Sequence, residues 1–232
     1  MVRQAGFISR KFRDLSVVFV GDGDSIALSI LHLWNSRYLR HRPKQLLVLD
    51  FDERIVNAVN GFAGRHGYSH FIVAELYNVA DPMPRRLLAK ADAFYTNPPW
   101  GSVNDGESVV AFVNRGIESV HDRGAGAVVI AHDLSLGWAQ RVLHRTQMEL
   151  LENDFVVNEI GAQRHHYYLD DAPQLQSRTL LARRLRPRIG APNSRPLNAR
   201  SFIDFYGRNQ HLRRGFVLDR NYLERESPGL VS

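Results

Sequence analysis

An amide, two prolines and an indole stand together in the motif Asn97-Pro98-Pro99-Trp100, directly after a short apolar segment at residues 91–94. Neither proline has an N–H group to donate, so the backbone leaves a strand ladder here in a stiff, extended form. The Asn97 side-chain oxygen and the carbonyl region of Pro98 can accept hydrogen bonds from an amine, and Trp100 can stack on a planar group or a cation. The motif therefore predicts a place that holds an amino nitrogen toward an electrophile. The alternative is a Pro-Pro turn beside a buried tryptophan.

A glycine-containing turn, Gly21-Asp22-Gly23-Asp24, follows a continuous apolar run and precedes a helix-like segment. Glycine allows a ligand to approach the backbone closely. Two carboxylates would repel a pyrophosphate but suit an amino group or a sulfonium charge, and the full G-x-G-x-x-G pattern of dinucleotide sites is absent. The turn therefore disfavours NAD and favours a cationic ligand. The alternative is that Asp24 or Ser25 only caps the helix.

Two acidic residues, Asp50 and Asp52, stand at the end of a second apolar run at residues 45–50. An acidic residue at this place commonly takes the ribose hydroxyls of an adenosine ligand. Asp50 follows Gly21 by 29 residues, and the basic linker at residues 37–44 can account for the excess over the usual spacing of ~20. Side chains alternate along a strand, so we expect one of the two carboxylates to face the ligand. Asp52 has the alternative of capping the next helix.

Polar residues also follow the third predicted strand and occupy the connection before the last one. Glu75, or in its place Asn78, can reach the adenine amino group of such a ligand. Asp170 and Asp171 add negative charge that would attract a cationic acceptor. The adjacent histidines at 165–166 diverge and have no further ligand at a suitable spacing, so we expect no metal site.

Alternating apolar runs and helical patterns give the layout of the chain. Strand and helix alternate five times, and two strands without a helix between them come last, which predicts a parallel sheet with helices on both faces and an antiparallel hairpin at one edge. This layout predicts an α/β Rossmann-like class I methyltransferase fold with a mostly parallel seven-stranded sheet. The predicted strands are residues 17–21, 45–50, 70–74, 91–96, 124–133, 155–160 and 177–183, and the predicted helices begin at residues 26, 53, 85, 108 and 137.

The motifs together resemble two groups of enzymes. One is the amino-methyltransferases, which act on exocyclic amines of adenine or cytosine and share an Asn/Asp-Pro-Pro-aromatic motif. The other, similar over roughly residues 15–182, is the branched-chain polyamine synthases, which are aminopropyltransferases. Their Gly-Asp-Asp-Asp turn, V-x-D-x-D-E-R-like strand, Pro-Pro-aromatic motif and Phe-x-x-Arg-Gly-Ile-Glu helix correspond to residues 21–24, 48–54, 97–100 and 112–118.

The resemblance implies one chemistry with two possible group donors. Decarboxylated S-adenosylmethionine would pass an aminopropyl group to a polyamine, which is the main prediction. S-adenosylmethionine would pass a methyl group to an amino group of a nucleic-acid base, which is the alternative. The catalytic candidates, which hold the amine, are Asn97, Pro98, Trp100 and Asp24. The donor-binding candidates are Gly21, Asp22, Gly23, Asp50, Asp52 and Glu75.

Two positions depart from the polyamine pattern. Gly23 replaces the middle Asp of the turn, and Asn97 replaces the Asp of the Pro-Pro motif. An amide cannot take a proton from an ammonium substrate, whereas a nucleobase amine needs no such base. The substitution therefore favours the methyltransferase alternative or assigns deprotonation to Asp24 or Asp170. A third interpretation is a degenerate Rossmann domain that binds without catalysis.

Composition and charge set the remaining expectations. The 232 residues are 44% hydrophobic and include no cysteine, which excludes disulfides and thiolate chemistry. We expect a transferase domain at residues 1–184 and an Arg-rich extension at 185–232, since residues 183–232 carry eleven arginines, no lysine and four acidic side chains. The extension would bind nucleic acid, or serve as a solvated appendage or the subunit contact of a homodimer. We see no signal peptide or membrane span and expect a cytoplasmic protein.

Overall fold

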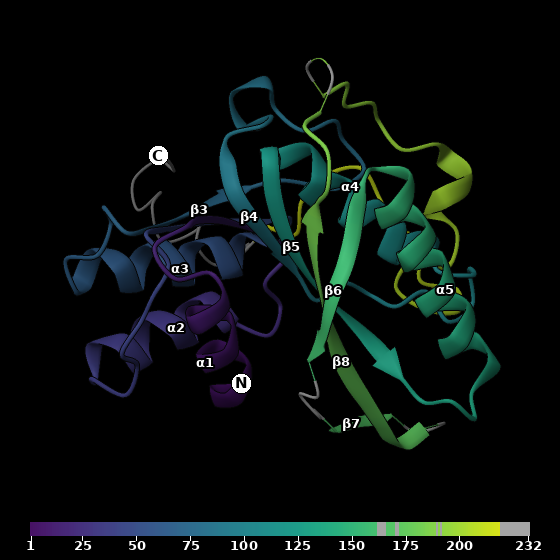
Figure 1. Ribbon diagram of the computed structural model, residues 1–232, viewed down its shortest axis with the longest axis horizontal. Helices are drawn as coiled ribbons and strands as arrows, with labels where there is room; N and C mark the ends of the chain where they lie inside the picture. Colours follow the sequence, from purple (N-terminus) through teal and green to yellow (C-terminus); the bar gives the residue numbers. More distant parts are fainter. Residues whose placement is uncertain (162–165, 170–171, 189, 191, 219–232) are drawn as a thin grey trace, which may run out of the picture.

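A mixed β-sheet runs through the centre of the computed structural model, which describes residues 1–161, 166–169, 172–188, 190 and 192–218 (Figure 1). Its strands are β1 Ser16–Val20, β2 Gln45–Asp50, β3 Ile72–Leu76, β4 Ala91–Thr96, β5 Val120–His132, β6 Phe155–Gly161, β7 His166–Leu169 and β8 Ala172–Arg184. The hydrogen-bonded order is β3-β2-β1-β4-β5-β8-β6, and the short β7 pairs with β8 outside this path.

The first five strands are parallel to one another, and β8 is antiparallel to both β5 and β6. The predicted hairpin is therefore present, with its second strand inside the sheet and its first strand at the edge. This arrangement confirms the predicted seven-stranded class I methyltransferase fold, to which β7 adds a short strand. Because β1 lies between β2 and β4, the carboxyl ends of these three strands meet at one edge of the sheet.

Helices cover both faces of the sheet (Figure 1). One face carries α1 Val2–Lys11, α2 Ile26–Asn35 and α3 Glu53–Arg65, and the other carries α4 Glu107–Ser119 and α5 Gly137–Glu152. Successive residues of β4 show the alternation, since Tyr95 packs in the first core and Phe94 in the second. The continuous apolar runs of the sequence therefore correspond to strands that are buried on both sides.

Several predicted boundaries differ from the structure. The third strand spans Ile72–Leu76 instead of 70–74, because its register is fixed by pairing with β2, where Leu46 lies opposite Ile72. The helix predicted from residue 85 is only a 3₁₀ turn, η1 Arg85–Leu87. Helix α1 was not predicted, although it buries Phe7 and Ile8. His165, Asp170 and Asp171 lie outside the described residues.

Residues 192–217, here named the C-terminal segment, run along the face that carries α4 and include the 3₁₀ turn η2 Ala199–Phe202. Arg115 of α4 is almost fully buried and donates to the Arg195 carbonyl at 2.8 Å. Phe205 is fully buried in the second core and Leu212 is 3% exposed. The apolar residues at 201–206 therefore pack on the body of the protein. Within the part of the chain that the structure describes, no helix is long and apolar enough to cross a membrane.

Candidate functional site

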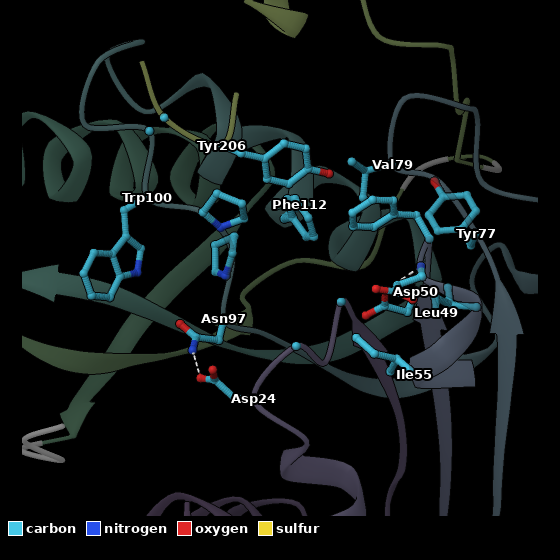
Figure 2. A pocket seen from close by; sticks show the side chains of 18 of the residues that line it. Asp24, Leu49, Asp50, Ile55, Tyr77, Val79, Asn97, Trp100, Phe112 and Tyr206 are labelled. Atoms are coloured by element: carbon cyan, nitrogen blue, oxygen red, sulfur yellow. Dashed lines mark hydrogen bonds between the residues drawn. The ribbon is translucent and has the colours of Figure 1, made fainter. Parts of the chain in front are cut away.

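A cavity of about 480 Å³ opens at the carboxyl edge of the sheet (Figure 2). The loop after β1 contributes Gly21 to its lining, the end of β2 contributes Asp50, and the loop after β4 contributes Asn97 and Trp100. The expectation that the first, second and fourth strands send their loops into one pocket is therefore confirmed. Figure 2 shows Asn97 at one end of the cavity and Asp50 at the other.

The first turn owes its shape to Gly21 and Asp22. Gly21 has a φ of +72°, and a Cβ atom built on it would lie 2.9 Å from the Phe112 ring. Asp22 is 3% exposed, and its carboxylate accepts from the N–H groups of Ile26 and Ala27 at 2.8 and 3.0 Å. Burial raises the pKa of Asp22 well above its ordinary value. Asp22 is therefore the residue that caps α2, and it is not among the cavity-lining residues described.

This result corrects two sequence-based interpretations of the turn. The cap hypothesis named Asp24 or Ser25, yet Ser25 makes no side-chain cap bond. Asp22 was expected to contact the donor, but its carboxylate faces the start of α2 and stabilises the loop from below. Gly23 and Asp24 line the cavity, and their contact with a ligand stays a prediction. The sequence could not separate Asp22 from Asp24, because only the three-dimensional path of the turn buries one of them.

Asp50 and Asp52 both line the cavity but differ in their surroundings. Asp50 accepts from the N–H groups of Asp22 at 2.9 Å and Asp52 at 3.0 Å, so its carboxylate ties the first turn to the end of β2. Burial raises the pKa of Asp50 despite these bonds. Asp52 caps α3 through the Arg54 N–H and pairs with the Arg54 guanidinium at 2.5 Å, which lowers the pKa of Asp52. The capping alternative for Asp52 is therefore confirmed, and Asp50 is a buried carboxylate whose described hydrogen bonds come from backbone N–H groups.

The opposite end of the cavity is built around Asn97. Its side-chain nitrogen donates to the Asp24 carboxylate, so the amide of the Pro-Pro motif and the carboxylate of the first turn meet directly (Figure 2). Thr96 donates to the Val20 carbonyl at 2.8 Å and so joins the ends of β4 and β1, from which the same two loops start. The Trp100 indole N–H donates to the Val129 carbonyl at 3.3 Å, which fixes the ring beside the motif. An amide, a carboxylate and an indole thus line the same cavity, and their joint role in holding an amine stays a prediction.

The structure does not bring Glu75 to the cavity. Because β3 ends later than predicted, Glu75 lies within the strand opposite Leu49, and its carboxylate pairs with Arg86 at 2.6 Å. Asn78, the other candidate for an adenine contact, is 1% exposed. Its amide donates to the carbonyls of the C-terminal segment instead. The residues that line this part of the cavity after β3 are Tyr77 and Val79.

Four further aromatic residues line the cavity that sequence reasoning did not assign to it: Phe51, Phe112, Trp138 and Tyr206. Phe51 lies between Asp50 and Asp52 in the sequence, and this position could have indicated that it lines the cavity. Trp138 of α5 packs against the second core and also lines the cavity. Tyr206 comes from the C-terminal segment, and nothing local in the sequence connects it with the site. Among the described residues, no three potential ligands cluster to hold a metal ion.

Comparison with known proteins gives three findings. A family model described as the branched-chain polyamine synthase A C-terminal domain matches residues 7–188. An N(4)-bis(aminopropyl)spermidine synthase from Methanocaldococcus jannaschii is 29% identical over 157 residues, which cover 65% of this chain and 39% of that protein. The chain therefore spans about two fifths of this curated relative.

Two solved structures show the same fold. A mutein of the branched-chain polyamine synthase from Thermus thermophilus, in complex with N4-aminopropylspermidine and 5'-methylthioadenosine, superposes with a TM-score of 0.67 at 20% identity, over 89% of this chain and 61% of that one. A geranyl diphosphate C-methyltransferase from Streptomyces coelicolor superposes with a TM-score of 0.56 at 12% identity, over 79% of this chain and 76% of that one. At these identities the likeness concerns the fold.

Proposed function

The chain belongs to the family of branched-chain polyamine synthase A C-terminal domains, and from this premise we propose that it transfers an aminopropyl group from decarboxylated S-adenosylmethionine to the nitrogen of a polyamine. The single observation that carries the proposal is the joint cavity, which has a buried carboxylate, Asp50, at one end and the Asn97–Asp24 pair at the other. A nucleoside and an amine acceptor can occupy such a cavity at the same time.

The donor end suits an adenosine group. Asp50 stands at the end of β2, where open α/β sheets bind the ribose of nucleoside ligands, and each of its oxygens keeps acceptor capacity beyond one backbone bond. Apolar side chains surround this carboxylate in the cavity, among them Leu49, Ile55 and Val79. The Thermus thermophilus relative contains 5'-methylthioadenosine, the nucleoside that remains after aminopropyl transfer. These features support an S-adenosylmethionine-derived donor.

The acceptor end suits an amine. The acceptor nitrogen would bond to the Asn97 oxygen and the Pro98 carbonyl region, with Trp100 packed on the neighbouring carbons or on a charged end. Its lone pair attacks the propyl carbon next to sulfur, the carbon–sulfur bond breaks, and the electron pair returns to sulfur. The nitrogen then releases a proton, for which Asp24 is the nearby carboxylate. Such an in-line displacement depends mainly on orientation.

One observation favours a second candidate function. Asn97 cannot accept a proton, and an exocyclic amine of a nucleobase is already neutral. Methyl transfer from S-adenosylmethionine to such an amine would use the same donor site and the same amide. The Arg-rich part of the chain would then bind phosphates, with an affinity that falls steeply as the salt concentration rises.

Titration calorimetry with the two donors separates these functions. Aminopropyl transfer predicts tighter binding of decarboxylated S-adenosylmethionine, methyl transfer predicts tighter binding of the intact form, and failure to bind either would refute both. Asn97→Ala should abolish transfer and leave donor affinity within a few-fold of wild type. Normal turnover in that variant would contradict the acceptor position proposed here.

A further inference from the structure

The C-terminal segment, which lies beyond the residues matched by the family model, forms one wall of the cavity. The match ends at residue 188, yet Tyr206 and Gly207 line the same cavity as Asp50 and Asn97. Figure 2 shows the Tyr206 ring above the cavity, between the Asn97 end and the Asp50 end. A side chain at this height would contact whatever occupies the middle of the cavity.

Two groups of contacts fix the segment on either side of Tyr206. On the side before it, Phe205 is fully buried and its carbonyl accepts from the Ser108 hydroxyl at 2.5 Å. On the side after it, the Leu212 N–H donates to the Phe202 carbonyl at 2.8 Å and closes the turn on itself. The backbone around Tyr206 is therefore held against α4.

The end of the segment is attached directly to the donor side of the cavity. Val217 forms a parallel bridge next to β2, in which its N–H donates to the Phe51 carbonyl at 2.9 Å and its carbonyl accepts from the Glu53 N–H at 2.8 Å. The segment therefore spans from α4 to the end of β2 and passes over the cavity between them.

The ring of Tyr206 makes two aromatic contacts. It stacks on Phe51 with a centroid distance of 5.7 Å and an interplanar angle of 21°, and it meets Phe205 edge-on at 5.1 Å. The Tyr206 and Phe51 rings therefore form one aromatic surface, and Phe51 directly follows Asp50 in the chain. Burial and the nearby Asp50 charge raise the pKa of the Tyr206 hydroxyl, which keeps it protonated and able to donate.

We propose that Tyr206 is a donor-binding residue, which extends the aromatic surface of Phe51 along the nucleoside and places its hydroxyl at the ribose beside Asp50. The inference rests on the proposed function, since it assigns a further contact to the nucleoside of the donor. It also gives the C-terminal segment a role in the site: the segment completes the donor end of the cavity from outside the family-matched part of the chain.

The test is a calorimetric titration with 5'-methylthioadenosine, which probes the donor site without turnover. We compare the wild type with Tyr206→Phe, Tyr206→Ala and the control Tyr38→Ala, whose side chain is 80% exposed and outside the cavity lining described. Loss of one hydrogen bond should weaken binding about threefold to tenfold in Tyr206→Phe. Loss of the ring as well should weaken it more than tenfold in Tyr206→Ala, and Tyr38→Ala should match the wild type.

The outcomes distinguish the inference from the function on which it rests. If the wild type binds the nucleoside and both Tyr206 variants bind it equally well, Tyr206 has no role in donor binding, while the proposed function stands. If the wild type does not bind the nucleoside, the proposed function fails and the inference fails with it. Should Tyr206→Ala not fold, as judged by circular dichroism, Tyr206→Phe decides alone, because it retains the stacked ring.

Discussion

Replacing Asn78 by alanine tests whether one buried amide holds the C-terminal segment in place. The Asn78 side chain donates to the carbonyls of Arg213 at 2.8 Å and Gly215 at 2.6 Å, and it accepts from the Ala80 N–H at 2.9 Å. Alanine removes all three bonds. At about 1 kcal/mol net for each, the two bonds to the segment amount to ~2 kcal/mol. This free energy favours the docked segment over an open state.

The structure indicates how that loss would appear. If the segment can open without global unfolding, ~2 kcal/mol raises the open population roughly thirtyfold. Hydrogen exchange at the Leu212 and Val217 amides reports this opening, because both amides are bonded within the docked segment. We expect these two amides to exchange roughly thirtyfold faster in Asn78→Ala.

A matched control is available elsewhere in the chain. Asn60 makes two amide bonds of similar length, both to Ala74 at 2.9 Å, and none of the bonds described for it reaches the C-terminal segment. Asn60→Ala should lower the free energy of unfolding and leave exchange at Leu212 and Val217 in its wild-type range under native conditions. Unchanged exchange in Asn78→Ala, together with reduced global stability, would refute the reasoning, because Asn78 would then support only the turn at Ala80.

Three further predictions concern the two loops of the site. Gly21→Ala should lower the unfolding free energy by about 1–2 kcal/mol, because Gly21 has a positive φ, and it should also weaken nucleoside binding. Gly23→Ala should leave the unfolding free energy nearly unchanged, because no atom lies within 4 Å of the added Cβ. Equal losses of unfolding free energy in the two variants would contradict this prediction. Asp22 has a raised pKa in the folded protein, so between that pKa and about 4 the folded protein binds a proton that the unfolded chain does not. The unfolding free energy of the wild type, compared with that of Asp22→Asn, should therefore rise as the pH falls through this range. Urea unfolding at several pH values measures the difference, and a constant difference would contradict the reasoning. Asn97→Asp places a second carboxylate beside Asp24 and should move the acid limb of the transfer rate to higher pH, which a pH–rate profile would test.

The sequence predicts the elements that end in strong local signals. Strands 45–50 and 91–96 have the predicted bounds, because an apolar run forms each strand and a polar or Pro-Pro segment ends it. Helix α3 begins at residue 53 as predicted, directly after the capping Asp52. The third strand is displaced because its register depends on its partner β2, which is a tertiary effect. Helix α1 was not predicted, because charged residues interrupt its apolar stripe in the sequence, although Phe7 and Ile8 of that stripe are buried.

The site shows the same division between local and tertiary information. The convergence of the loops followed from parallel strand order, so Asp50 and Asn97 could be expected in one cavity. The sequence could not show which carboxylate of the first turn is buried and which lines the cavity. Asp22 is buried because it bonds to the start of α2, which depends on the path of the folded turn. Tyr206 could not be expected at all: it lies 155 residues after Phe51, and only the fold stacks the two rings.

The amide at position 97 fits both amine acceptors, so the choice of reaction depends on the other end of the cavity. In the polyamine synthases that the chain resembles, a carboxylate stands at this place, whereas here Asn97 bonds to Asp24 and the pair carries a single negative charge. A carboxylate about 4 Å from an ammonium stabilises the protonated form by ~1 kcal/mol in water and ~4 kcal/mol at an effective dielectric constant of 20. A protonated nitrogen has no lone pair for attack, so a carboxylate at position 97 would both attract the ammonium and be able to accept its proton, which an amide cannot do. With Asn97 in this place, Asp24 is left both to attract a polyamine and to accept its proton, while a nucleobase amine does not require that step. Under the proposed function, we therefore expect discrimination between an aminopropyl and a methyl donor to depend on the residues that surround the sulfonium substituent, and donor titrations of variants at the donor end would test this.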